Sequence, residues 1–325
     1  MQKTQNPHQK LHAMSQAILI TSIGAKIPLI KAVRRAKDAF NPALAIIGGD
    51  SNHDALGRAY VDSFWQMPRL ENLTLETLIT YAQAHNIRAI IPTRDAELPF
   101  FASYKKTLAE AGIDVFVADT EAVAFCYDKL RFYQDAKLSW AIETALDIER
   151  LPAQKFVVKE RFGAGAKSMA CNVSKEEALA HAKELQEPIF QPFIEGKEYS
   201  IDCYVDKNMA CRGVVVRSRD VVVNGESQVT TIVHDRELVQ RAAEFVTCHG
   251  IKGHSVLQVL KNQNGSYLIE CNARFGGAST LSEYAGLKSF LWFLQEANGE
   301  NFEVTITDKI IRQVRQDKED SYFES

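Results

Sequence analysis

Residues 268–277 read Leu268-Ile-Glu-Cys-Asn-Ala-Arg-Phe-Gly-Gly277 and combine an apolar strand with an unusual set of polar side chains. Side chains two positions apart in a strand lie on the same face, so Glu270 and Asn272 point the same way. Arg274 joins them if the extended geometry continues. Oxygen donors beside a guanidinium suit Mg²⁺ bound to a polyphosphate, because this ion prefers oxygen ligands and shares them with phosphate and water. The stretch therefore predicts a metal–phosphate site.

The preceding strand, Ser255-Val-Leu-Gln-Val-Leu-Lys261, contains Gln258 as its interior polar residue. A three-residue loop that ends at a left-handed Gly265 would set Gln258 opposite Glu270. A two-residue Asn-Gly turn would set it opposite Cys271, on the other face of the hairpin. We therefore predict the three-residue loop, with Gln258 as the third metal ligand.

The alternative is that this hairpin face is solvated and has no chemical role. Three apolar side chains on the same face disfavour that interpretation, since an exposed face would not need them. They are Val256, Leu260 and Leu268.

A second segment, residues 156–169, places Lys159 at the end of a strand and a glycine-rich loop, 161–168, directly after it. Gly163 and Gly165 would let backbone N–H groups approach phosphate oxygens, and Lys159 could neutralise an inner phosphate. A plain hairpin turn is the alternative, and two glycines do not decide between them. The loop matches neither G-x-x-x-x-G-K-[ST] nor G-x-G-x-x-G, which disfavours two common nucleotide-binding folds.

A third segment, Gln191-Pro-Phe-Ile-Glu-Gly-Lys-Glu198, links two predicted strands. Its extended backbone could meet an adenine edge, while Phe193 and Ile194 cover the ring faces and Glu198 reaches the ribose hydroxyls. The alternative is an ordinary loop in which Glu195 and Glu198 are solvated.

The first 120 residues alternate short apolar runs with helical patterns, which predicts an α/β unit with a parallel, doubly wound sheet and right-handed crossovers. The expected strands are 17–22, 43–47 (stopped by Gly48-Gly49-Asp50), 88–91 and 113–117, with helices at 26–39, 74–86 and 96–111. Beyond Asp119, short turns between extended segments predict an antiparallel, α+β unit. Its expected strands are 155–159, 189–194, 198–206, 209–217, 220–223 and a hairpin at 254–271, with helices from 128 and at 174–186, 235–249 and 278–298.

Composition excludes several other classes of protein. A chain of 325 residues is long enough for two or three compact units. A net charge of −3 argues against a general nucleic-acid binder, which needs a basic surface. No apolar run reaches the length of a membrane span, and the polar start is unlike a signal peptide. We therefore expect a cytoplasmic protein without nucleic-acid or membrane partners.

Together these segments resemble the ATP-grasp superfamily, particularly the branch that contains the carbamoyl-phosphate synthase large subunit and single-chain carboxylate–amine ligases. The resemblance covers roughly residues 17–300. It implies a pre-ATP-grasp domain at 16–120 and an ATP-grasp domain of two α+β subdomains at 121–308, with a lid at about 150–190. The segments 1–15 and 309–325 are then a flexible N-terminus and a charged tail.

The resemblance also implies nucleotide-binding roles. Asp128-Lys129 is similar to the family's helix-opening pair, whose lysine contacts the nucleotide, and Lys159 matches the second nucleotide lysine. Residues 163–168, including Gly163, Gly165 and Ser168, resemble the mobile loop over the phosphates. The segment 191–198 resembles the linker that holds adenine and ribose, with Gln191 where relatives often have Glu.

The metal and substrate positions are similar too. Gln258, Glu270 and Asn272 match the branch's magnesium ligands, and Arg274 its phosphate-stabilising arginine. One departure is Val256, where related synthases commonly carry Asn. Residues 91–98 resemble a loop facing the substrate cleft, so Thr93, Arg94 and Glu97 are expected either to touch substrate or, for Thr93, to cap a helix.

The expected activity is ATP- and Mg²⁺-dependent ligation, with Mn²⁺ as an alternative ion. A carboxylate would be activated as an acyl phosphate and attacked by an amine, giving an amide or peptide bond, with Lys159 and Arg274 as catalytic residues. Arg217 and Arg219 are equally well explained as phosphate contacts or as a solvated strand face. The alternatives are a phosphotransferase of the same fold and a non-catalytic nucleotide-binding partner. The partners would be small carboxylates and amines, with a homodimer as one form of assembly.

Overall fold

The computed structural model describes residues 16–135, 140–163, 168–223 and 225–315. The expected flexible segment 1–15, Gly165 and the last ten residues of the expected tail lie outside these ranges. Within them, no helix is long and apolar enough to cross a membrane.

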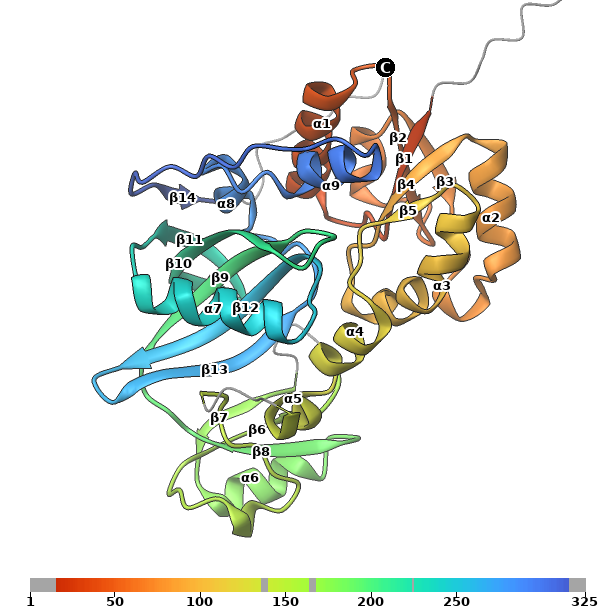
Figure 1. The fold of residues 1–325 in the computed structure, drawn as a ribbon. Coiled ribbons are helices and arrows are strands. Elements are labelled where there is room, and N and C mark those ends of the chain that lie inside the picture. Colours follow the sequence, from red (N-terminus) through yellow and green to blue (C-terminus); the bar gives the residue numbers. More distant parts are fainter. Residues whose placement is uncertain (1–15, 136–139, 164–167, 224, 316–325) are drawn as a thin grey trace, which may run out of the picture.

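The first sheet is parallel, five-stranded, and ordered β3-β2-β1-β4-β5. Figure 1 shows α1 beside one face and α2 and α3 beside the other, which confirms the predicted doubly wound α/β arrangement. Its elements are β1 (Ala17–Thr21), α1 (Ile27–Phe40), β2 (Ala45–Asp50), η1 (Leu56–Tyr60), β3 (Ser63–Gln66), η2 (Leu70–Asn72), α2 (Leu75–Ala84), β4 (Ile87–Ile91), η3 (Asp95–Glu97), α3 (Leu98–Glu110) and β5 (Asp114–Val115).

The predicted end of the second strand at Gly48 is wrong, because β2 continues to Asp50. A glycine fits there because a Cβ on Gly48 would lie 2.5 Å from the Ile23 side chain. Strand β3 was not predicted, since its four residues are exposed or half-buried and form no apolar run.

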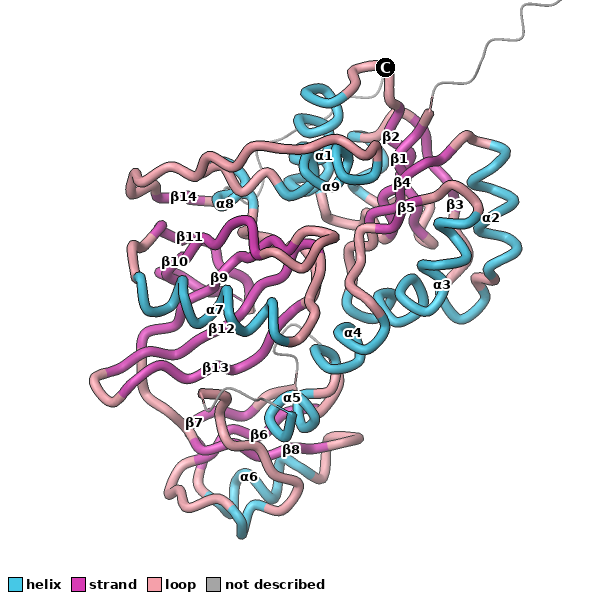
Figure 2. Tube along the Cα trace, in the orientation of Figure 1, coloured by secondary structure: helices cyan, strands magenta, loops and turns pink. Residues whose placement is uncertain are grey.

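The second sheet has six strands in the order β13-β12-β9-β10-β11-β14, and every pairing is antiparallel. Helix α7 lies along one face of it (Figure 2). The expected strands 209–217 and 220–223 form one continuous strand, and β11 and β14 were not predicted. The elements are β9 (Lys197–Val205), β10 (Cys211–Val223), β11 (Glu226–Ile232), α7 (Arg236–Cys248), β12 (Gly253–Asn262), β13 (Gly265–Asn272), α8 (Thr280–Tyr284), α9 (Ser289–Ala297) and β14 (Arg312–Val314).

A small third sheet, ordered β7-β6-β8, is antiparallel and packs against α6 around its own apolar cluster. It falls within the stretch proposed as a lid. Its elements, with those that precede it, are α4 (Thr120–Tyr127), α5 (Lys129–Asp135), η4 (Ile148–Arg150), β6 (Phe156–Glu160), β7 (Ala170–Val173), α6 (Lys175–Ala182) and β8 (Pro188–Pro192).

The hairpin β12–β13 has the predicted pairing but a different turn. Gln258 lies opposite Glu270, as expected. Asn262 pairs with Gly265, so the loop has two residues, and the predicted three-residue loop is wrong. The register instead shifts next to Gln258, where Ile269 has no partner. A bulge adds one residue to one strand, and this extra residue restores the pairing that the loop was expected to produce.

Gly286 supports a stability prediction. It has φ +114°, and a Cβ there would lie 2.1 Å from the carbonyl oxygen of Thr305. We expect Gly286→Ala to lower the free energy of unfolding by about 3 kcal/mol, since backbone strain adds to a backbone clash. Gly299→Ala is the matched control, because Gly299 has φ +74° but nothing within 4 Å of a Cβ. Equal losses in urea denaturation would contradict the assigned clash.

Candidate functional site

A cavity of about 760 Å³ lies between the third sheet and the second sheet. It is lined by residues of β6, β8, β9, β10, β12 and β13. Every residue that was predicted to bind the nucleotide, its phosphates or the metal, and that the structure describes, lines this cavity. They are Lys129, Lys159, Gly163, Ser168, Gln191, Phe193, Ile194, Glu198, Gln258, Glu270, Asn272 and Arg274.

The three predicted metal ligands form one half-buried group on the hairpin. Gln258 and Glu270 face each other across the strands, and the Asn272 amide donates to Glu270 Oε1 at 3.2 Å. Within the described ranges, no group of three or more His, Cys, Asp or Glu could hold a metal. The donors fit a hard cation that completes its shell with phosphate and water rather than a closed protein cage.

Two lysines face the same cavity from the side of the third sheet, Lys159 on β6 and Lys129 at the start of α5. Lys159 is 8% exposed, and burial lowers its pKa to about 8, although the charge of Glu270 opposes the shift. A buried ammonium of this kind is stabilised when an anion such as a phosphate joins it. Lys129 Nζ donates to the Gly163 carbonyl at 2.6 Å and so holds the base of the glycine-rich loop.

Asp128 explains why a helix opens beside this loop. Its Oδ1 accepts hydrogen bonds from the backbone N–H groups of Leu130 and Arg131 at the start of α5. The same carboxylate forms an ion pair with Arg161, the first residue of the loop. Burial opposes ionisation, but the bond from Arg161 holds the pKa of Asp128 below its usual range. Helix start and loop base are therefore joined by one carboxylate.

The linker 191–198 borders the cavity from another side. Gln191 is buried, and its amide donates to Thr144 Oγ1 at 2.8 Å. The backbone N–H of Phe193 donates to the Lys155 carbonyl at 2.8 Å, so this group is not open to an adenine edge. Glu198 is half-buried and pairs with Arg219 at 3.0 Å, so it is not a freely solvated loop residue. Burial raises its pKa, and the Arg219 charge opposes that rise.

Arg274 lies at the cavity wall and is held by a residue that the sequence did not single out. Its guanidinium bonds Asp95 at 2.5 Å, from the short helix η3 beside the first sheet. Asp95 sits in the segment predicted to face substrate, but Thr93, Arg94 and Glu97 do not line the described cavity.

Two of those three residues brace the loop that presents Asp95. Thr93 Oγ1 donates to the carbonyls of Thr21 and Ser22 at 3.0 Å. Glu97 Oε1 accepts from the backbone of Thr93 at 2.7 Å and of Arg94 at 2.9 Å. Thr93 is therefore neither an exposed substrate contact nor a helix cap.

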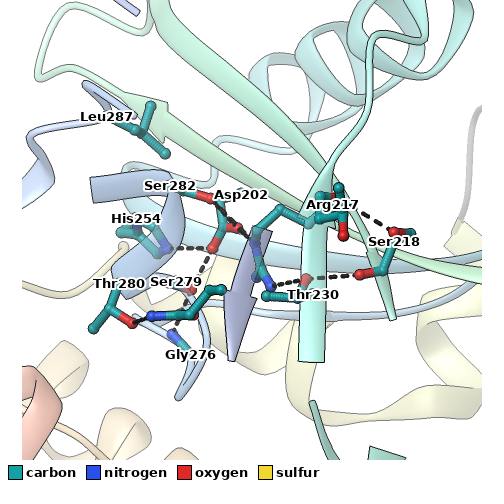
Figure 3. Close-up of polar contacts among 12 residues, drawn as sticks. Asp202, Arg217, Ser218, Thr230, His254, Gly276, Ser279, Thr280, Ser282 and Leu287 are labelled. Atoms are coloured by element: carbon teal, nitrogen blue, oxygen red, sulfur yellow. Dashed lines mark hydrogen bonds and ion pairs between the residues drawn. The ribbon is translucent and has the colours of Figure 1, made fainter. Parts of the chain in front are cut away.

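Behind the cavity lies a buried polar network centred on Asp202, shown in Figure 3. Asp202 Oδ2 accepts from Arg217 at 2.5 Å and from Ser282 at 2.7 Å, while its Oδ1 contacts His254 and Ser279. Burial alone would raise the pKa of Asp202, but the Arg217 charge holds it well below its usual range. Arg217 is 2% exposed and paired with Asp202, so it does not belong to a solvated strand face, and the phosphate contact considered for it stays a prediction.

The network also fixes the loop that follows Arg274. Ser279 Oγ, which contacts Asp202, accepts from the Gly276 backbone N–H at 3.0 Å. Residues 276–278 line the cavity, so the buried carboxylate positions part of its wall. Asp202 interrupts an otherwise apolar, buried strand segment, and this is the sequence signal that could have identified it.

Comparisons with known proteins agree with this architecture. Residues 18–116 match the family described as "PylC-like, N-terminal domain", and residues 184–319 match "ATP-grasp in the biosynthetic pathway with Ter operon". A carbamoyl-phosphate synthase of Methanobrevibacter smithii is 26% identical over 80% of this chain and 76% of its own length.

Two solved structures show the same fold. The biotin carboxylase domain of Hydrogenobacter thermophilus 2-oxoglutarate carboxylase, in complex with MgADP, ADP and bicarbonate, has a TM-score of 0.72 and 15% identity, over 91% of this chain and 72% of that one. An L-amino acid ligase from Bacillus licheniformis has a TM-score of 0.65 and 16% identity, over 87% and 74%. The matched families and the shared architecture show that this chain has the ATP-grasp fold, with residues 184–319 matching an ATP-grasp family.

Proposed function

We propose that the protein is an ATP- and Mg²⁺-dependent ligase that joins a carboxylate to an amine. A carboxylate oxygen attacks the γ-phosphorus of ATP, the bond to ADP breaks, and an acyl phosphate forms. The amine then attacks the acyl carbon, loses a proton and displaces phosphate, so that an amide or peptide bond results. The relatedness to carbamoyl-phosphate synthase and the fold shared with an L-amino acid ligase support this class of reaction.

One observation carries the proposal: the oxygen donors of Gln258, Glu270 and Asn272 share a single cavity with the buried Lys159. Bound to these donors, Mg²⁺ would neutralise charge on the phosphates. Lys159 stabilises the transferring group, and Arg274 approaches it from the other wall. Attack by one anion on another needs this concentration of positive charge.

The glycine-rich loop has a second task in this scheme. An acyl phosphate hydrolyses in open water, so the site has to exclude solvent after transfer. Lys129 anchors the loop through the Gly163 carbonyl, and both Gly163 and Ser168 border the cavity. We propose that the loop covers the phosphates during turnover.

The test is to measure ADP and free phosphate separately while acids and amines are supplied singly and in pairs. The ligase is expected to release both products only when acid and amine are present together. Release of ADP with a phosphorylated product and no free phosphate would establish the phosphotransferase instead. Absence of both products, with MgADP still bound, would establish a non-catalytic nucleotide-binding protein.

Location and assembly form part of the same proposal. We propose a cytoplasmic enzyme that acts on small molecules, either as a monomer or as a homodimer. Light scattering at several protein concentrations distinguishes the two states, and fractionation of cells tests the location.

A further inference from the structure

The cavity has a second group of charged residues, which no predicted role includes. It comprises Lys26, Glu226 and Arg315, which line the cavity together with Arg274 and with Gly276 and Gly277. Lys26 comes from the first sheet's side, between β1 and α1, whereas Glu226 begins β11 of the second sheet and Arg315 directly follows its edge strand β14. We call Lys26, Glu226 and Arg315 the distal triad.

Lys26 stands at the start of α1, but its side chain does not stabilise this helix. It is the N-cap of α1 and makes no side-chain capping bond. Ser, Thr, Asp or Asn would satisfy free N–H groups there, whereas a cation is repelled by the positive end of the helix dipole. A residue that breaks a local rule in this way is typical of a functional position.

The ammonium group of Lys26 is also held without a close partner. Among the described residues, none forms a hydrogen bond or an ion pair with Lys26 Nζ. Burial lowers the pKa of Lys26, and the charges of Arg274 and Arg315 lower it further. The nearby carboxylates of Glu226 and Asp95 oppose this shift, so each of these four charged groups lies close enough to Lys26 to act on its charge.

Two ion pairs cancel most of the surrounding charge. Arg274 is paired with Asp95, and Arg315 Nη1 bonds Glu226 Oε2 at 2.9 Å. Arg315 Nη1 also lies 3.4 Å from where a Cβ on Gly277 would stand, so a side chain at this glycine would press on the guanidinium. Of these five charged groups, the two arginines are paired with the two carboxylates. Lys26 is therefore the cation that can pair with one anionic group of a ligand.

We infer that Lys26 binds the carboxylate of the acid substrate, and that the distal triad selects acids with a single anionic group. This inference rests on the proposed function. A second carboxylate or a phosphate on the substrate would meet Asp95 and Glu226, and like charges at such distances repel. Monocarboxylates and neutral amino acids therefore fit, whereas dicarboxylic and phosphorylated acids do not.

The experiment measures acid binding to the full chain held with MgADP, so that it does not depend on turnover. Isothermal titration uses matched acids: propionate against succinate, alanine against aspartate, and serine against phosphoserine. In at least one pair, the acid with a single anionic group (propionate, alanine or serine) is expected to bind more tightly than its partner. Tighter binding of every dianion, or binding of no acid in the panel, would overturn the inference.

Two variants assign the effect to these residues. Lys26→Met is expected to weaken acid binding at least about tenfold, the usual loss for one charged hydrogen bond, while MgADP affinity stays unchanged. Lys26→Arg should recover part of that loss. Equal acid affinity in wild type and Lys26→Met would overturn the inference.

Glu226→Gln provides a test by gained binding, which a misfolded protein cannot mimic. It releases Arg315 from its ion pair, so the affinity for succinate or aspartate is expected to rise relative to propionate or alanine. Glu303→Gln is the control, because Glu303 is exposed and does not line the cavity. Unchanged preference in Glu226→Gln would overturn the selectivity, whereas the phosphate-release assay tests the ligase independently.

Discussion

Glu270→Ala is expected to abolish turnover, with kcat/KM lowered by about 10³-fold or more, while the fold is retained. Glu270 supplies the carboxylate among the three predicted metal ligands, and its half-buried side chain packs in no apolar cluster. Its loss removes the negative charge that would hold Mg²⁺ but leaves the backbone ladder with β12 intact. Product release is measured with excess ATP and MgCl₂.

Two further variants separate metal binding from damage to the hairpin. Glu270→Gln keeps the shape but not the charge, so it should show nearly the full loss, partly relieved by high Mg²⁺. Gln263→Ala changes an exposed residue in the turn of the same hairpin and should retain normal activity. Near-normal turnover in Glu270→Ala would remove the metal assignment.

Asp202→Ala is expected to cause the largest loss of stability, about 3–5 kcal/mol, because it leaves the buried Arg217 without a counter-charge. His254, Ser279 and Ser282 lose their shared acceptor as well. Urea denaturation followed by circular dichroism measures the change in the free energy of unfolding.

A double variant tests the cause of that loss. In Asp202→Ala with Arg217→Met, no uncompensated charge remains buried, so the double variant should be more stable than Asp202→Ala alone. Simple addition of the two single losses would show that Arg217 is not the source of the penalty. The comparison applies to stability only, since the loop 276–278 loses its support in both variants that lack Asp202.

The strand pattern of residues 255–272 was sufficient to predict which side chains share a face, because alternation is a local property of the backbone. The pairing of Gln258 with Glu270 followed correctly, but for the wrong reason. A bulge at Ile269 depends on packing around the whole hairpin, and turn residues alone do not reveal it.

The strand pattern does not predict the role of a residue whose partners lie far away in the sequence. Arg217 is equally compatible with solvent or phosphate until β9 places Asp202 beside it. Lys26 and Arg315 line one cavity from distant parts of the chain, and Asp95 contacts Arg274 at its wall from a third. The strand β14 forms only by adding to β11 over three residues, a length too short for a periodic signal.

The bond between Arg274 and Asp95 joins residues that are 179 positions apart, one beside the hairpin and one beside the first sheet. A phosphate that draws the guanidinium toward itself must compete with this carboxylate. Because linkage is reciprocal, bound phosphate weakens the Arg274–Asp95 bond by the same factor by which that bond weakens phosphate binding. Ligand binding in the cavity and the contact between the hairpin and the N-terminal sheet are therefore thermodynamically coupled through Arg274.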